Sequence, residues 1–185
     1  FGKLLLQDKV VAIGETGLDY FRNFSPATDQ KNSFVAHLEL AEKIEKPLFL
    51  HERDAFKDFS EIMKAHASLC ERAIVHCFTG DRIALKTYLD MGMYIGITGW
   101  ICDKKRGATL REIISYAPIE RLMIETDAPY LTPHINDVKK QLAHKHRNEP
   151  WTLQHTAQAL ADAMTVDVNT VRARTTQTAI RFFGL

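Results

Sequence analysis

The sequence predicts an α/β protein built on a parallel β-sheet, and two observations lead to this fold class. Five short apolar runs of β type alternate with longer segments whose apolar residues recur at helical spacing. The short runs are nearly continuous rather than alternating with polar residues, which is typical of parallel strands that helices cover. We therefore expect five parallel strands with helices on both faces of the sheet.

The first half of the chain contains three of the expected strands. Ser25 and Pro26 have the residue types that begin a helix, as N-cap and first helical residue, and Asp54 is expected to cap the next helix. The apolar stripe of the first of these helices includes Phe34 and Leu38 at helical spacing. The three strands are expected at residues 10–14, 47–50 and 73–75.

The second half of the chain continues the alternation. The helix after the third strand is expected to end before Gly92, a residue type common just past a helix C-terminus. The remaining strands are expected at residues 94–99 and 122–124. Glu149 and Pro150 open a further helix, and the last helix ends at Gly184. Five strands alternating with helices over 185 residues predict a single domain, residues 1–185.

Composition excludes several classes of protein. The chain is 45% hydrophobic and 25% charged with a net charge of +1, so a polyanion would have to be bound by a local patch or by metal. Its three cysteines contain no C-x-x-C pair, which favours a reducing cytoplasm over a disulfide framework. The sequence has no apolar stretch near the length of a membrane span.

Four of the five expected strands end in a residue that can bind metal, namely Glu15, His51, His76 and Asp127. The carboxyl ends of parallel strands share one edge of the sheet, where α/β proteins build their sites. Carboxylate and imidazole ligands together suit Zn²⁺ or Mn²⁺, and carboxylates also admit Mg²⁺. Taken singly, each residue could instead be a hydrogen-bonded or capping group; four in equivalent positions favour a metal site. Glu125 could ligate, orient a ligand or bind an arginine.

Six motifs carry a family resemblance across essentially the whole chain. They occupy residues 14–20, 51–55, 76–80, 94–99, 125–131 and 147–150, and in this order and spacing they resemble TatD-family metal-dependent deoxyribonucleases. Residues 99–107 further resemble the TatD branch itself. The resemblance implies a (β/α)₈ TIM barrel of the amidohydrolase type that holds one or two divalent metal ions. It implies that Glu15 can bridge two metals, that His51 and His76 bind the second, and that Asp127 also accepts a proton from the attacking water.

The sequence departs from the family pattern at its beginning. Family members start with a strand that often carries His-x-His and continue with two more βα units, whereas this chain matches strands four to eight only. We therefore expect the C-terminal five βα units of an incomplete barrel, lacking the N-terminal part. Because five strands cannot close a barrel, the chain is expected to belong to a longer protein or to associate through its open edge.

The function implied is hydrolysis of DNA phosphodiester bonds by metal-activated water, as in a deoxyribonuclease or exonuclease. Low net charge favours strand ends or single strands over long duplexes. The expected partner is DNA, as single strands or 3′ ends, with RNA as a further candidate. Arg53, Asn148 and Glu149 are assigned supporting or substrate-binding roles together with Glu125. Two alternatives remain: an amide or ester hydrolase with the same metal site, and an inactive fragment that acts as a binding module.

Other residues near the motifs have two interpretations each. The basic residues Lys104, Lys105 and Arg106, with the segment His144–His146, are either solvated or contact phosphates at the rim of the site. Tyr20, Phe78, Trp100 and Tyr130 are either packed in the protein or available to stack on bases.

Overall fold

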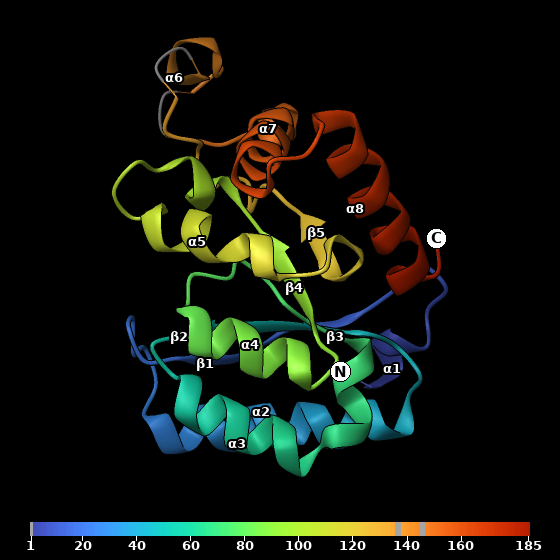
Figure 1. Ribbon diagram of the computed structural model, residues 1–185. Coiled ribbons are helices and arrows are strands. Elements are labelled where there is room, and N and C mark those ends of the chain that lie inside the picture. Colours follow the sequence, from blue (N-terminus) through green and yellow to red (C-terminus); the bar gives the residue numbers. More distant parts are fainter. Residues whose placement is uncertain (1, 136–137, 145–146) are drawn as a thin grey trace.

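The computed structural model describes residues 2–135, 138–144 and 147–185 and contains one parallel sheet (Figure 1). Neighbouring strands in the sheet follow the order of the chain, and all four pairings are parallel. The five strands are β1 (Ile13–Asp19), β2 (Leu48–Arg53), β3 (Ala73–Val75), β4 (Tyr94–Ile97) and β5 (Leu122–Ile124). The predicted parallel α/β class is therefore confirmed.

Helices connect the strands and follow the last one. The α-helices are α1 (Gly2–Leu5), α2 (Ala27–Lys43), α3 (Phe56–Ala65), α4 (Arg82–Asp90), α5 (Ala108–Ile113), α6 (Val138–Gln141), α7 (Leu153–Met164) and α8 (Val168–Phe183). Short 3₁₀ helices are η1 (Ala67–Arg72), η2 (Gly99–Cys102), η3 (Ile114–Tyr116), η4 (Ile119–Arg121) and η5 (Pro150–Thr152). Within the described part of the chain, every helix is too short or too polar to span a bilayer.

Among the described residues, helices cover β1 and β2 on one face only, so the expectation of helices on both faces is wrong for this part of the sheet. On β1, Ile13, Thr16 and Leu18 are buried, whereas Glu15 is exposed. Figure 1 shows α2 and α3 along the same side of these strands. Consecutive strand order explains this, because right-handed crossovers that all advance in one direction place their helices on one face. The other face is left for polar side chains.

The first two strands extend further than expected and contain two of the predicted site residues. β1 begins at Ile13 and runs to Asp19, so Glu15 lies within the strand, at a bulge between Ile13 and Thr16. β2 likewise continues past His51. Gly17, opposite His51, has φ +149°, and a Cβ there would overlap the His51 carbonyl oxygen. This glycine lets the two strands pair beyond the end of the apolar run.

Two of the predicted helix caps are wrong and two of the predicted helix ends are confirmed. The N-cap of α2 is Pro26 rather than Ser25, and no side chain caps it. The N-cap of α3 is Ala55, whose N–H donates to Glu52 Oε1 at 2.8 Å, so Asp54 does not cap this helix. Gly92, at φ +82°, follows the C-cap of α4, and Gly184, at φ +67°, ends α8.

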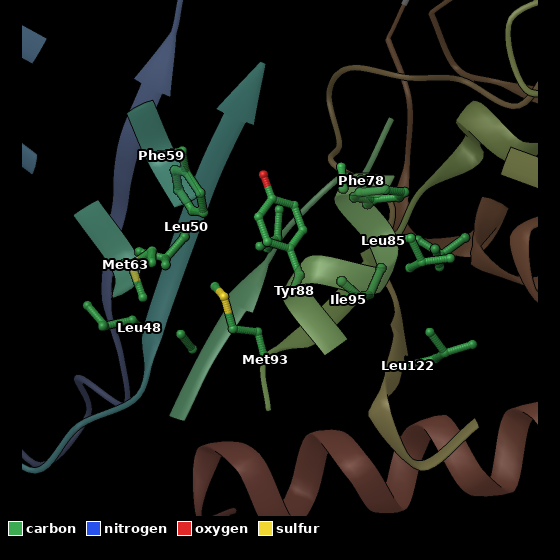
Figure 2. Close-up of a cluster of buried hydrophobic side chains, with 14 of the residues drawn as sticks. Leu48, Leu50, Phe59, Met63, Phe78, Leu85, Tyr88, Met93, Ile95 and Leu122 are labelled. Carbon is green, nitrogen blue, oxygen red and sulfur yellow. The ribbon is translucent and has the colours of Figure 1, made fainter. Parts of the chain in front are cut away.

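The hydrophobic core lies between the sheet and the helices α2, α3, α4, α7 and α8, and Figure 2 shows the part of it that α3 and α4 cover. Tyr88 of α4 is fully buried, and its ring contacts Phe59 and Phe78 edge-on at centroid distances of 5.5 and 6.2 Å. Its hydroxyl donates to Glu52 Oε2 at 2.9 Å, and burial raises the pKa of Tyr88 far above its usual value. Because Glu52 follows His51 on β2, this packing fixes the end of the strand that carries the site.

Candidate metal centre

Three of the four predicted metal ligands meet at one point on the uncovered face of the sheet. Glu15 Oε1 lies 2.9 Å from His51 Nδ1 and 2.9 Å from His76 Nε2. The two imidazole nitrogens are 3.3 Å apart. One ligand atom from each side chain therefore lies within 4.8 Å of the others. We call these three residues the ligand cluster.

Each member of the ligand cluster comes from a neighbouring strand. Glu15 projects from the bulge of β1, His51 from the uncovered face of β2, and His76 directly follows β3. The His76 N–H donates to the carbonyl of Leu50 at 2.9 Å, which extends the pairing of β2 with β3 by one residue. The Phe49 ring lies 4.9 Å from the His76 imidazole, so His76 is packed in place and buried.

Two carboxylates hold the imidazoles of the cluster from behind. Asp19 Oδ2 lies 3.1 Å from His51 Nε2, and Glu125 Oε2 lies 3.7 Å from His76 Nδ1. Such partners fix which nitrogen of a metal-binding histidine faces the ion. Sequence reasoning missed Asp19 as a site residue. The signal was present, because residues 15, 17 and 19 share one face of an extended strand.

Glu125 reaches His76 by crossing over β4. It comes directly after β5, yet its Oε1 accepts a hydrogen bond from the Cys77 N–H, beyond β3, at 2.6 Å. Gly96 of β4 lies beneath this carboxylate, and a Cβ there would overlap Glu125 Oε1 and lie 3.0 Å from His76 Cα. β4 has no ionisable residue at its end, and its contribution to the site is the room that Gly96 leaves for the Glu125 carboxylate.

Burial and hydrogen bonding set the charges of the ligand cluster. Hydrogen bonds with His51 and then His76 hold the pKa of Glu15 well below its usual range, although burial acts in the opposite direction. Burial alone would lower the pKa of His76, but its contacts with Glu125 and Glu15 outweigh burial and raise this pKa to about 10. A metal that binds these three atoms would therefore displace a proton from His76.

Asp127, the fourth predicted ligand, lines the same cavity but lies outside the ligand cluster. The cavity holds about 120 Å³ and is also lined by Glu15, His51 and His76. Asp127 is partly buried with φ +56°, and burial is the main reason that its pKa is raised. The structure thus brings three predicted ligands together, whereas Asp127 lines the same cavity outside their cluster.

Neither Asn148 nor Glu149 lines the cavity: Asn148 contacts the loop around Asp127, and Glu149 contacts its own neighbourhood in the chain. The buried Asn148 side chain donates to the carbonyl of Thr126 at 3.0 Å, and its backbone N–H donates to the carbonyl of Pro129 at 2.9 Å. Glu149 accepts hydrogen bonds from the Ala143 N–H and from the Trp151 indole, both at 2.8 Å. Asn148 therefore ties down the segment that carries Asp127 from both sides.

The rim of the cavity is aromatic and basic. Arg53, Trp100 and Tyr130 line it, whereas Tyr20 donates its hydroxyl to Asp58 at 2.7 Å and Phe78 is buried in the core. The three basic residues of the 104–106 segment are exposed, as is His144, and residues 145 and 146 lie outside the described part of the chain. Of the four aromatic residues considered for base stacking, Trp100 and Tyr130 are the two that reach the cavity.

The donor set of the cluster fits a divalent metal ion. Bond lengths of ~2.0–2.1 Å place tetrahedral ligands about 3.3 Å apart, and the three donors are separated by 2.9, 2.9 and 3.3 Å. Two imidazole nitrogens with one carboxylate oxygen suit Zn²⁺ or Mn²⁺ better than Mg²⁺, which prefers oxygen ligands. Fold and site together define a metal-competent parallel α/β protein whose site lies at the carboxyl edge of the sheet.

Comparison with known proteins gives the family. The family model described as "TatD related DNase" matches residues 1–184, and the chain belongs to this family. A protein named "3'-5' ssDNA/RNA exonuclease TatD" from Rahnella sp. is 47% identical over 159 residues, which is 86% of this chain and 59% of that protein. A protein of the same name from Edwardsiella piscicida is 44% identical over 182 residues, 98% of this chain and 69% of that protein.

Solved structures give the same fold. A TatD homologue from Escherichia coli has a TM-score of 0.83 at 25% identity and is matched over 96% of this chain and 65% of its own. A TatD-family hydrolase from Entamoeba histolytica has a TM-score of 0.83 at 27% identity, with 95% and 64% coverage. The chain thus spans 59% to 69% of the length of these four proteins. The resemblance inferred from the six sequence motifs is confirmed.

Proposed function

We propose that the chain belongs to a divalent-metal-dependent hydrolase that cleaves phosphodiester bonds in DNA, acting on single strands from the 3′ end, with RNA as a further substrate. The observation that carries this proposal is the ligand cluster, in which Glu15 Oε1 lies 2.9 Å from a nitrogen of both histidines. The proposal is supported by family membership and by relatives named as exonucleases of single-stranded DNA and RNA.

Glu15, His51 and His76 would hold the metal. When bound, a divalent ion supplies an activated water and neutralises charge on the phosphoryl oxygens. Glu15 is half exposed at its side chain, so it can also serve a second ion on its open side, as the family resemblance implies. Elemental analysis of the metal-loaded protein distinguishes Mg²⁺, Mn²⁺ and Zn²⁺, and one bound ion from two.

Asp127 would accept the proton of the attacking water and contribute a further metal ligand. Its place in the cavity supports the role, and its raised pKa suits a group that takes up a proton. Glu125 and Asp19 would orient His76 and His51 through the contacts described above. Arg53, on the cavity wall, would bind a phosphate, and Asn148 and Glu149 would position the loops beside Asp127.

We also infer that the five strands correspond to strands four to eight of an eight-stranded TIM barrel, and that residues 1–185 form one domain. Among the described residues, β1 pairs with β2 alone and β5 with β4 alone, so the sheet has two edges at which another chain could pair. Edge-mediated association follows from this, with the oligomeric state to be measured. The three unpaired cysteines support a cytoplasmic location.

The test is hydrolysis by chelator-treated protein that has been reloaded with one metal at a time. Single-stranded DNA, RNA and duplex DNA, each labelled at the 5′ end, are compared with panels of amides and lactones. We expect metal-dependent shortening of the single strands from the 3′ end, with Asp127→Asn as the inactive control. Elemental analysis of the same samples gives the number and identity of the bound ions.

The alternatives give different results in the same experiment. Turnover of amides or lactones without cleavage of nucleic acid would replace the nuclease by an amide or ester hydrolase. If the wild type binds no metal and His76→Ala changes nothing in the metal titration, the result would favour an inactive fragment that acts as a binding module. Size-exclusion chromatography of the same protein tests association through the sheet edges.

A further inference from the structure

Arg53 and Trp100, which line the cavity, belong to a row of four side chains that alternates between aromatic rings and guanidinium groups. The Arg53 guanidinium lies 3.9 Å from the centre of the Phe21 ring and 5.9 Å from the centre of the Trp100 ring. The Arg106 guanidinium lies 4.5 Å from the same Trp100 ring. The order Phe21, Arg53, Trp100, Arg106 joins the end of β2 to the segment after β4, beside the ligand cluster.

Trp100 is held in a fixed orientation. Its indole N–H donates to the carbonyl of Arg106 at 3.1 Å, and Arg106 is itself held by the buried carboxylate of Asp103. Asp103 accepts hydrogen bonds from the Arg106 backbone N–H at 2.8 Å and from its Nε at 2.7 Å, and His134 Nδ1 lies 3.0 Å away. A side chain positioned in this way binds a flat ligand without first losing rotamer freedom.

The two arginines flank Trp100 differently. Arg53 lines the cavity together with Trp100, whereas Arg106 does not line it. Of the two arginines, Arg53 is therefore the one that meets Trp100 within the cavity. The 5.9 Å between Arg53 and Trp100 is about 1 Å less than the ~7 Å that a flat ring needs between two groups in van der Waals contact. Making this room requires Arg53 to move together with the Phe21 ring on which it packs, and the exposure of Phe21 allows this movement.

We propose that the cavity side of Trp100 is a nucleobase subsite, in which one base of a single-stranded nucleic acid stacks between the indole and the Arg53 guanidinium. A stacked base covers one face of the guanidinium and leaves its N–H groups, which lie in the plane of the group, free to bind a phosphate. Every base offers a π-face, so this subsite is tolerant of sequence. The inference deepens the proposed function and rests on it, because it specifies single strands whose bases are unpaired.

Intrinsic fluorescence gives a direct test, because Trp100 and Trp151 are the only two tryptophans of the chain. In the Trp151→Phe protein, emission reports Trp100 alone, and a stacked base quenches it. We expect quenching on titration with a single-stranded DNA oligonucleotide in the presence of a chelator, and none with the same backbone carrying abasic sugars. In the Trp100→Phe protein, emission from Trp151 should stay unchanged.

Affinity, measured by anisotropy of a labelled oligonucleotide, separates stacking from a structural role. Trp100→Leu is expected to weaken binding of the intact oligonucleotide by about 5- to 150-fold, the range for loss of one stacked base. Trp100→Phe should retain most of the affinity. The matched control is Tyr116→Leu, because the exposed Tyr116 ring also lies under an arginine, Arg82, at 4.2 Å but away from the cavity.

Three results would overturn the subsite. These are an absence of quenching, equal weakening of intact and abasic oligonucleotides by Trp100→Leu, and no oligonucleotide binding at all. Failure of the proposed function looks different: reloaded metal would give no hydrolysis, while base-dependent quenching and the effect of Trp100→Leu on binding would persist.

Discussion

The ends of β1 to β3 and the loop after β5 contribute to one cavity in different ways. Glu15, His51 and His76 contact one another directly and lie on, or directly after, paired strands. Asp127 lies outside this cluster, at φ +56° in a loop that is held by Asn148. We therefore expect Glu15, His51 and His76 to carry most of the metal affinity, and proton transfer to depend on the separately positioned Asp127.

The largest effect that tests this comparison is expected for Asp127→Asn. Loss of a proton acceptor lowers turnover by roughly 10²–10⁴-fold, while metal affinity falls less than it does when a member of the ligand cluster is removed, because Asp127 lies outside that cluster. Single-turnover hydrolysis and metal titration are measured on the same sample. A loss of metal binding as large as that caused by removing a member of the ligand cluster would show that Asp127 and the cluster form a single metal centre.

His76→Ala is expected to weaken metal binding far more than Asp127→Asn does. The variant removes one of three ligands, so metal affinity should fall by more than the ~10–100-fold that loss of a supporting partner costs. Isothermal titration measures this loss. His66→Ala is the matched control, because His66 pairs with Glu42 at 2.8 Å and does not line the cavity. Unchanged metal binding by His76→Ala would rule out the cluster as the metal site.

Gly96→Ala tests the contact that Glu125, after β5, makes with the His76 segment, after β3. The added methyl overlaps Glu125 Oε1, so we expect about 1–3 kcal/mol of destabilisation and, because Glu125 loses its hold on His76, about tenfold weaker metal binding. Chemical denaturation and metal titration measure the two effects. Gly2→Ala is the control, since the nearest atom to its Cβ is 3.8 Å away. Additive losses in the double variant with Glu125→Gln would contradict this account.

The smallest effects distinguish the acids by opposite responses to pH in metal-free protein. The folded pKa of Glu15 lies below its usual 4.5, so its ionised form stabilises the fold above that pH, and this stability is lost as pH falls. The folded pKa of Asp127 lies above its usual 3.8, so its protonated form is favoured in the fold, and this stability is lost as pH rises through the folded pKa.

Denaturant unfolding at neutral and acid pH measures this contrast. Glu15→Gln should destabilise the protein and Asp127→Asn should stabilise it at neutral pH, each by no more than about 1 kcal/mol, because solvent screens these partly exposed groups. Both differences should shrink in acid. Changes of the same sign in the two variants would show that the two acids share one environment.

The sequence was sufficient for the order of strands and for the general location of the site. Apolar runs mark β3 and β5 to the residue, because each is a short buried strand whose polar neighbours lie outside the sheet. The start of β1 was wrong, since Val10 and Val11 precede the sheet and the pairing continues to Asp19 through the close approach at Gly17. Propensity cannot detect such an approach, because it depends on the neighbouring strand.

The candidate site was predicted in part for a similar physical reason. Position just after an apolar run was enough to bring Glu15, His51 and His76 into one group, because the runs lie on parallel strands that share their carboxyl edge, although β1 and β2 continue beyond Glu15 and His51. It could not indicate how far Asp127 stands from them, which depends on backbone conformation in a loop. Nor could it separate Trp100 from Phe78 as a cavity residue, because burial of each ring is decided by packing between distant segments.

The bulge in β1 allows one of the three donor atoms of the ligand cluster, the Glu15 oxygen, to shift relative to the other two. His76 is packed against Phe49, and Asp19 and Glu125 support the two imidazoles, so the two nitrogen donors are stiff. Glu15 sits where the strand register shifts and its side chain is half exposed, so its oxygen can move along the line towards the nitrogens at little cost. We therefore expect the cluster to accept ions of different radii, with the carboxylate absorbing the difference in bond length.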